Sequence, residues 1–225
     1  MKRVTLLDTA PMPGGGELAL YQHGQDFIIK VPGGQDLMST RTYGSAEALA
    51  EIACAELAGR ARPRVLIGGL GVGFTLASAL RHLGQDAEVV VAELVPGVVE
   101  WNRGPLGEHA GHPLRDGRVV VREVDVAIIL REGGRAFDAI LLDVDNGPEG
   151  LTQKGNDWLY SRAGLNVIHR VLRPKGVLAV WSAGTDPPFS KRLRKAGFEV
   201  DEIPVKAHRG KGARHLIWIA RTPER

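Results

Sequence analysis

The sequence predicts an α/β fold built on a mostly parallel, seven-stranded sheet, with a small antiparallel β appendage in front of it. Three observations carry this prediction. From residue 64 onward, short β-branched runs alternate with helix-like stretches, a pattern typical of right-handed βαβ units. The strand expected at 139–143 is continuously apolar, as befits a strand covered on both faces. Before residue 45, Pro- and Gly-rich turns instead separate short alternating stretches.

The chain is expected to divide into an appendage and one main domain. Residues 1–44 should form a small β-hairpin-rich appendage, because turn residues flank its alternating stretches. Ser45 precedes an Ala-, Glu- and Leu-rich stretch that ends before Gly59, which predicts a helix over 46–57 with Ser45 as its N-cap. Residues 45–225 should form a Rossmann-like nucleotide-binding, catalytic domain, a size that suits a single core.

Within the main domain, strands and helices should alternate until a closing antiparallel pair. A Gly-rich turn between the last two alternating stretches predicts that pair, at the edge of the sheet. The expected strands are 65–68, 88–93, 118–123, 139–143, 177–181, 199–205 and 215–220. The expected helices between them are 75–83, 97–101, 159–171 and 190–196.

Composition excludes several classes of protein. The apolar fraction of 44% and the charged fraction of 24% are typical of globular chains. The lone cysteine, Cys54, lies in an apolar run, so neither a disulfide framework nor a cysteine-based metal site is expected, and no metal is predicted. The net charge of +3 is mild, so no nucleic-acid partner is expected. No apolar run reaches the ~18 residues that span a bilayer, which predicts no membrane contact and a cytoplasmic location.

The most specific signal is a glycine-rich stretch between an apolar strand and a helix, formed by Gly68, Gly69, Gly71 and Gly73. Glycines permit a tight turn and let backbone N–H groups approach a ligand at the positive end of the helix dipole. The spacing is Gly-x-Gly-x-Gly rather than the Gly-x-Gly-x-x-Gly typical of NAD-type dehydrogenases. It therefore favours a nucleotide of the S-adenosylmethionine type as the ligand.

Two acidic side chains follow the next two strands and suit the same nucleotide. Glu93 ends the second strand, about 20 residues after the glycine turn, where a carboxylate can accept both hydroxyls of a ribose. Asp125 follows the third strand, where it can accept the exocyclic amine of adenine, although Glu123 lies close enough to compete.

Asp143, Asp145 and Asn146 follow the fourth strand and are the candidates for chemistry. Ligands of open α/β sheets bind outside the carboxyl ends of the strands, and buried acids are costly unless they are paired. An amine nucleophile arrives as ammonium, which Asp143 could orient and deprotonate with help from Asp145 or Asn146. Trp158 is a further candidate for the acceptor site, with anchoring of its helix as the alternative.

The segment from about residue 64 to residue 220 resembles the spermidine synthase (polyamine aminopropyltransferase) family, particularly its short bacterial members. The likeness rests on the residues at 68–75, 92–96, 125, 137–148 and 172–178. It implies a methyltransferase-like fold, decarboxylated S-adenosylmethionine as aminopropyl donor, methylthioadenosine as by-product, a diamine acceptor and a homodimer. By the same likeness Glu93 would bind ribose, Asp125 adenine and Asp143 the attacking amine.

The chain departs from the family pattern at three places. The family's Gly-Gly-Gly-Asp-Gly-Gly turn has no acid here, since Leu70 and Val72 stand between the glycines. The Asp-x-x-Asp-Pro that follows the fourth strand is altered, with Asp145 displaced relative to Asp143. The tyrosine-containing segment of the polyamine pocket has no clear counterpart, and Tyr43 is the residue that could face the ligand there.

Three functions are compatible with these residues. The first is aminopropyl transfer to a polyamine, which predicts an acidic groove beside Asp143 that would select a cationic acceptor. The second is methyl transfer to a small molecule, which a neutral or basic pocket would favour. The third is nucleotide binding without catalysis, which predicts a glycine turn blocked by a side chain such as Phe74 or Trp101.

Overall fold

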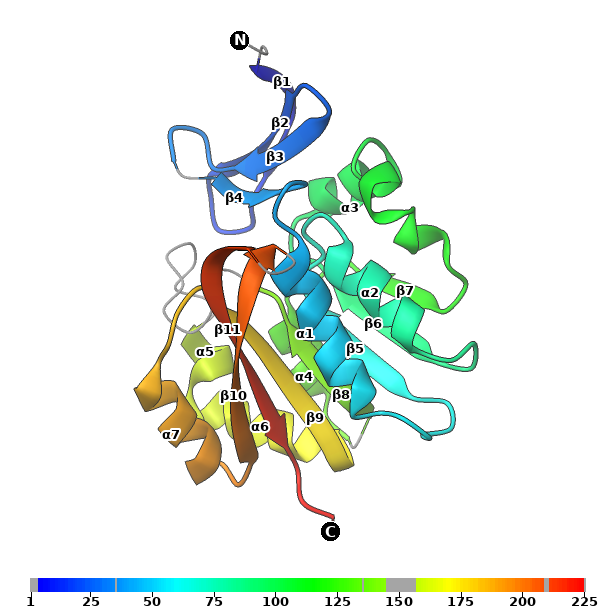
Figure 1. Cartoon of the computed structure of the whole chain (residues 1–225), viewed down its shortest axis with the longest axis vertical. Helices are drawn as coiled ribbons and strands as arrows, with labels where there is room; N and C mark the ends of the chain where they lie inside the picture. The colour runs from blue at the N-terminus through cyan, green and yellow to red at the C-terminus, as the bar shows by residue number, and fades with distance from the viewer. Residues whose placement is uncertain (1–3, 35, 135, 145–156, 209–210, 225) are drawn as a thin grey trace.

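The computed structural model of the chain describes residues 4–34, 36–134, 136–144, 157–208 and 211–224. Two sheets organise this part of the chain (Figure 1). A four-stranded antiparallel sheet comes first, and a seven-stranded sheet with helices on both faces follows. Among the described residues, no helix combines the length and apolarity needed to cross a membrane.

The N-terminal sheet pairs its strands in chain order, β1-β2-β3-β4, all antiparallel. Its inner face buries alternating apolar side chains such as Leu18 and Leu20, which join the same core cluster as the large sheet. Asp8 accepts a hydrogen bond from the indole N–H of Trp101 over 2.8 Å, which fixes the small sheet to helix α3. The strands are β1 (Val4–Pro11), β2 (Glu17–His23), β3 (Asp26–Lys30) and β4 (Asp36–Ser39).

The large sheet has the strand order β10-β11-β9-β8-β5-β6-β7 and confirms the predicted class. Strands β9, β8, β5, β6 and β7 run parallel, whereas β11 is antiparallel to both β9 and β10. Every residue of the apolar strand β8 is buried, as expected for a strand covered on both faces. The strands are β5 (Arg64–Gly68), β6 (Glu88–Ala92), β7 (Val119–Arg122), β8 (Phe137–Leu142), β9 (Leu172–Ser182), β10 (Glu199–His208) and β11 (Lys211–Arg221).

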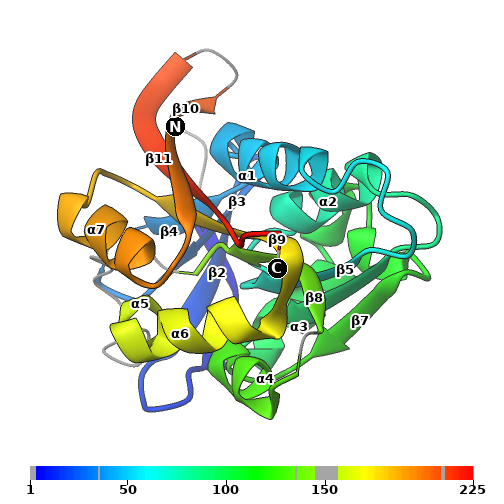
Figure 2. The same cartoon turned by 90° about the horizontal axis from the view of Figure 1, so that it is seen from below.

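Helices cover both faces of this sheet (Figures 1 and 2). One face packs against α1 (Gly44–Ala55), α2 (Phe74–His82) and α3 (Pro96–Arg103), and the other against α4 (Val126–Glu132), α5 (Asp157–Tyr160), α6 (Arg162–Val171) and α7 (Pro187–Lys195). Two short 3₁₀ helices, η1 (Gly107–Ala110) and η2 (Pro113–Arg115), connect α3 to β7. The chain thus forms a three-layer α/β unit with the small sheet at one end.

Several details differ from the sequence-based expectations. Helix α4 was not predicted, and β9 begins at Leu172 rather than at residue 177. Ser45 is not the N-cap of α1: the helix begins at Gly44, two residues before the predicted start, and the Ser45 hydroxyl hydrogen-bonds to His215 instead. The stretch expected as one helix over 159–171 is two helices, because Ser161 caps α6 by accepting the N–H of Gly164. Of these two serines, only Ser161 caps a helix.

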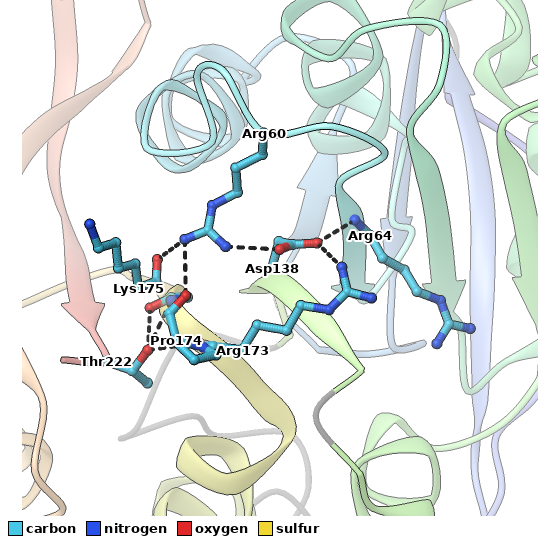
Figure 3. Close-up of polar contacts among 8 residues, drawn as sticks. Arg60, Arg64, Asp138, Arg173, Pro174, Lys175 and Thr222 are labelled. Carbon is cyan, nitrogen blue, oxygen red and sulfur yellow. Dashed lines mark hydrogen bonds and ion pairs between the residues drawn. The ribbon is translucent and has the colours of Figure 1, made fainter. Parts of the chain in front are cut away.

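Asp138 secures the amino end of β8, opposite the edge where the strands end (Figure 3). Its buried carboxylate accepts hydrogen bonds from Arg60, from Arg173 and from the backbone N–H of Arg64, at 2.7 to 2.8 Å. Arg60 also donates to the carbonyl oxygen of Pro174. A buried acid of this kind is stable only because two cations and a backbone donor meet it.

Candidate active site

The carboxyl ends of the parallel strands open onto a pocket of about 830 Å³, solvent-accessible part included. It lies where the strand order reverses between β5 and β8, the usual ligand position in open α/β sheets. We call it the glycine-turn pocket. Its polar wall consists of Gly69, Gly71, Glu93, Asp125 and Asp143, and its apolar wall consists of Met12, Leu18, Val31, Leu37 and Met38 of the N-terminal sheet with Ala92, Leu94, Val95, Val98, Val126 and Val144.

The turn after β5 requires glycine because its backbone passes very close to other atoms. Gly69, Gly71 and Gly73 all have positive φ, between 54° and 88°. A Cβ at Gly69 would lie 2.4 Å from the carbonyl oxygen of Asp143, and one at Gly73 would lie 2.9 Å from Asn102 Oδ1. Substitution would therefore displace the strand end that carries Asp143.

Several amides that were expected to meet the ligand are used inside the protein. The N–H of Gly69 donates to Ala92, that of Leu70 donates to Glu93, and that of Gly73 donates to Leu70, at 2.8 to 2.9 Å. For these groups the expectation of ligand binding is wrong, because the turn is closed onto the end of β6. Gly69 and Gly71 line the pocket, whereas Gly68 and Gly73 shape the turn without lining it.

Neither aromatic side chain that could have obstructed the turn does so. Trp101 is buried in the core against the N-terminal sheet, and Phe74 lines a neighbouring cavity instead. Met38 is the side chain that lies over the turn, since its sulfur would be 2.9 Å from a Cβ at Gly71. A methionine is an unbranched, adaptable side chain, so this contact leaves the pocket able to adjust.

Glu93 is buried at the end of β6 and faces the glycine turn. Its Oε2 accepts the N–H of Leu70 over 2.8 Å, and its Oε1 accepts the N–H of Val95 over 2.9 Å. Burial raises the pKa of Glu93, while these backbone donors act in the opposite direction. The backbone N–H groups of Gly71 and Leu94 also act on the carboxylate, so four backbone donors surround it. A carboxylate accepts about four hydrogen bonds, so a ribose diol would share its oxygens with these donors.

Asp125 is the N-cap of α4 and lines the same pocket. Its Oδ1 accepts the N–H of Ala127 over 2.8 Å, which stabilises the first turn of the helix. Its Oδ2 accepts no hydrogen bond from the described residues and can accept one from an amino group. The geometry fits an adenine amine without loss of the helix cap.

Asp143 follows β8 directly, where its own N–H donates to Gly68 over 2.9 Å. Thr75, at the start of α2, donates its hydroxyl to Asp143 Oδ2 and lies 3.3 Å from the carbonyl oxygen of Ala46. Although part of Asp143 faces the pocket, surrounding protein raises the pKa of its carboxyl by desolvation, and the Thr75 hydrogen bond opposes that shift. In the described part of the chain, no cationic side chain pairs with the Asp143 carboxylate.

A second cavity of about 1340 Å³, open to solvent, adjoins the first and shares Leu37, Met38, Gly71 and Asp143 with it. We call it the hairpin cavity, because residues of β10 and β11 form one wall. Its remaining lining residues are Ser39, Thr42, Ser45, Ala46, Leu70, Val72, Phe74, Thr75, Trp181, Ala183, Ala207, His208, Gly212, Ala213 and His215. Asp143 is the only carboxylate among these described residues.

The structure does not bring all predicted site residues together. Tyr43 is exposed and packs its ring against Phe74, with ring centres 5.0 Å apart, but lines neither cavity. Trp158 carries the guanidinium of Arg131 over its ring at 4.0 Å and also lies outside both cavities. Asp145 and Asn146 lie outside the described residues. The predicted binding roles of these residues stay predictions.

Sequence reasoning missed several residues that shape the site. Thr75 holds Asp143, and Asn102 Nδ2 donates to the carbonyl oxygen of Gly71 over 2.8 Å. His215 and Trp181 reach the hairpin cavity from β11 and β9, with ring centres 4.8 Å apart. Thr75 lies in the 68–75 stretch, but no feature of the sequence assigned it a role. The other three residues belong to no motif, because each comes from an element distant in sequence.

The chain shares its fold, a β10-β11-β9-β8-β5-β6-β7 sheet with helices on both faces, with solved structures of spermidine synthases and of a methyltransferase. No protein-family model matches the sequence, and no curated protein matches it. Solved structures do match, and they confirm the resemblance to spermidine synthases at the level of the fold.

Three of these structures illustrate the match. Spermidine synthase from Thermotoga maritima has a TM-score of 0.76 at 15% identity, over 98% of this chain and 74% of that one. A spermidine synthase in complex with the transition state analogue AdoDATO has a TM-score of 0.75 at 15% identity, over 98% and 73%. The 1,6-didemethyltoxoflavin-N1-methyltransferase from Burkholderia thailandensis, with bound S-adenosylhomocysteine, has a TM-score of 0.58 at 22% identity, over 81% and 80%.

Proposed function

We propose that the protein transfers an aminopropyl group from decarboxylated S-adenosylmethionine to an amine. The observation that carries this proposal is the charge of the glycine-turn pocket. Glu93, Asp125 and Asp143 line it, and none of the described residues that line it carries a positive charge. Such a pocket favours a ligand with more than one cationic centre and disfavours an additional carboxylate.

The two candidate donors differ in whether they carry a carboxylate. Decarboxylated S-adenosylmethionine carries a sulfonium and an ammonium, whereas S-adenosylmethionine carries an additional carboxylate. That carboxylate would be repelled by Asp143, which lies where the glycine-turn pocket meets the hairpin cavity. In this assignment Glu93 binds the ribose hydroxyls and Asp125 the adenine amine, while Asp143 orients the amine acceptor.

The extent of the fold match is a second support. Spermidine synthases match 98% of the chain, including the N-terminal sheet, whereas the methyltransferase matches 81%. The N-terminal sheet supplies the apolar wall of the glycine-turn pocket through Leu37 and Met38. A small amine is thus the proposed partner; homodimer formation and a cytoplasmic location stay predictions.

The proposed reaction is a single displacement. The acceptor ammonium gives up one proton, and the nitrogen lone pair then attacks the aminopropyl carbon bound to sulfur. The carbon–sulfur bond breaks with its electron pair on sulfur, which leaves a neutral thioether, methylthioadenosine, and a positively charged secondary amine. Binding both partners in line contributes most of the rate acceleration, because no covalent enzyme intermediate is required.

Methyl transfer is the second candidate, and a specific observation favours it. The hairpin cavity has a single carboxylate, Asp143, and two histidines among its described lining residues, so it lacks the acidic groove expected for a long polyamine. The glycine turn also lacks an acid that would contact a donor ammonium. A small nucleophile with one reactive nitrogen or oxygen would fit that cavity.

Calorimetry with decarboxylated S-adenosylmethionine, S-adenosylmethionine and methylthioadenosine separates these functions. We expect the decarboxylated donor to bind at least tenfold more tightly than S-adenosylmethionine, which corresponds to about 1.4 kcal/mol. Asp143→Asn should abolish most of this preference and reduce aminopropyl transfer about 100-fold while methylthioadenosine still binds. Equal affinity for both donors would favour methyl transfer, and no binding of any of the three would contradict an adenosyl-sulfonium site.

A further inference from the structure

The hairpin cavity contains a second titratable group in a fixed position, the imidazole of His215 on β11. Its Nδ1 lies 2.9 Å from Ser45 Oγ, in a hydrogen bond between β11 and α1. The edge of the ring packs against Trp181 of β9. Figure 1 shows the end of the β10–β11 hairpin beside the start of α1, where Gly44 also approaches the backbone of His208. Three elements therefore hold the imidazole at the cavity wall.

Two consecutive residues of α1 contact the groups that hold Asp143 and His215 in this cavity. Ser45 binds His215, and the carbonyl oxygen of Ala46 lies 3.3 Å from the Thr75 hydroxyl that donates to Asp143. One helix start thus sets the position of a carboxylate on one side and an imidazole on the other. Both groups line the hairpin cavity, next to the glycine-turn pocket.

We propose that His215 Nε2 is the proton acceptor for the attacking nucleophile, that Ser45 is its positioning residue, and that Asp143 orients the nucleophile without taking the proton. The inference rests on the proposed group transfer. It gives the two side chains different roles. The carboxylate of Asp143 binds the ammonium by charge, whereas the neutral imidazole of His215 accepts its proton.

The hydrogen bond with Ser45 sets which ring nitrogen is free. When Nδ1 carries the proton and donates to Ser45 Oγ, the lone pair is on Nε2, which makes no hydrogen bond to the described residues. One proton moves from the substrate ammonium to Nε2, the nitrogen lone pair then forms the new bond to carbon, and the imidazolium later releases that proton to solvent. The balance is one proton released per turnover, as the reaction requires.

The surroundings of His215 favour its neutral form. Burial lowers the pKa of the imidazole, so that it is a free base at neutral pH. Other titratable side chains lie on the elements around His215. Lys206 and His208 are on the paired strand β10, Glu47 is on α1, and Asp143 is across the cavity. The segment of β9 paired with β11, residues 177–182, has no titratable side chain.

Nitrogen NMR of the imidazoles tests the assignment without any turnover. We expect His215 at pH 7.5 to be the tautomer with the proton on Nδ1 and the lone pair on Nε2, and we expect Ser45→Ala to lose this preference. A proton on Nε2 in the unmodified protein would overturn the proposal. His82→Gln, at the end of α2, is the control. It removes another histidine whose Nδ1 contacts a backbone oxygen, so it identifies the His82 signal and should leave the His215 signal unchanged.

Kinetics with decarboxylated S-adenosylmethionine and 1,4-diaminobutane test the role in catalysis. His215→Gln should lower kcat about 100-fold, the usual contribution of a general base, and should remove the fall in kcat below about pH 6.5. Ser45→Ala should lower kcat several-fold with an unchanged KM, and His82→Gln should match the unmodified protein. An unchanged pH profile in His215→Gln would overturn the proposal.

Failure of the inference and failure of the proposed function give different results. Methylthioadenosine should bind to His215→Gln as it does to the unmodified protein, because His215 does not line the glycine-turn pocket. If the unmodified protein transferred no group from either donor, the proposed function would be wrong. The tautomer of His215 would then still show whether Ser45 leaves the lone pair on Nε2, which is the part of the inference that does not depend on turnover.

Discussion

The side-chain amide of Asn102 on α3 donates to the backbone carbonyl oxygen of Gly71 over 2.8 Å and to that of Val98 over 2.9 Å. The first bond ties the glycine turn to a helix that also carries the N-terminal sheet. The other amide atom, Asn102 Oδ1, is buried without a protein partner among the described residues. A buried acceptor without a partner costs stability. We therefore infer that Asn102 contributes to the geometry of the glycine turn more than to the stability of the fold.

Asn102→Ala should therefore weaken ligand binding more than it weakens folding. We expect about fivefold lower affinity for methylthioadenosine, because the loss of one hydrogen bond of about 1 kcal/mol frees the turn that forms the pocket. Calorimetry measures the affinity and thermal unfolding measures the stability. The matched control is Asn166→Ala on the exposed face of α6, which should change neither quantity. Equal losses of stability and affinity would contradict a positioning role.

Replacing either of the two aspartates at the ends of β8 by asparagine should change the stability of the protein, with a gain at Asp143 and a loss at Asp138. Asp143→Asn should raise the stability of the folded protein at neutral pH by about 1 kcal/mol, the usual gain when a buried functional group is replaced. Burial raises the pKa of Asp143, so the folded protein binds its proton more tightly than the unfolded chain does. Stability then falls as pH rises from about 3.9 through the folded pKa, and asparagine removes that loss while it still accepts from Thr75. Thermal unfolding at pH 5 and pH 8 should show the gain mainly at pH 8.

Asp138→Asn should instead destabilise the protein by about 3 kcal/mol, since it removes the one charge that pairs with both Arg60 and Arg173 in a buried position. Urea unfolding measures this loss, and methylthioadenosine binding to the remaining folded protein should be unchanged because Asp138 lies at the opposite end of the sheet. A gain in stability here, or a loss in Asp143→Asn, would contradict the assignment of one acid to structure and the other to function.

Local sequence patterns were sufficient to predict the strand and the acid that follows it. The apolar run of β8 predicted a buried strand, and the acid after it predicted a site at the strand end. The alternation of strands and helices likewise predicted the large sheet, because periodicity is a local property. The same applies to Glu93 and Asp125, whose positions after strands bring them to one edge.

What the sequence could not predict depends on contacts between distant segments. The hydrogen bond from Thr75 to Asp143 spans 68 residues, and that between Ser45 and His215 spans 170. Ser45 was predicted as a helix cap because serine commonly is one, but its hydroxyl is used by tertiary structure instead. The glycine turn was predicted to offer its amides to a ligand, yet Glu93 accepts one of them. Such competition between local and distant partners leaves no local pattern.

Glu93→Gln provides a sharp test of the glycine-turn pocket. Both carboxylate oxygens accept backbone N–H groups, from Leu70 and from Val95, so glutamine must place its own N–H₂ against one of these donors. We expect methylthioadenosine to bind about 100-fold more weakly, because two donors face each other and the ribose loses an acceptor. Glu88→Gln, at the exposed start of β6, is the matched control: it removes only the surface ion pair with Arg64 and should leave binding unchanged. If Glu93→Gln bound methylthioadenosine as tightly as the control, Glu93 would be a structural brace of the turn and the ribose would have to lie elsewhere.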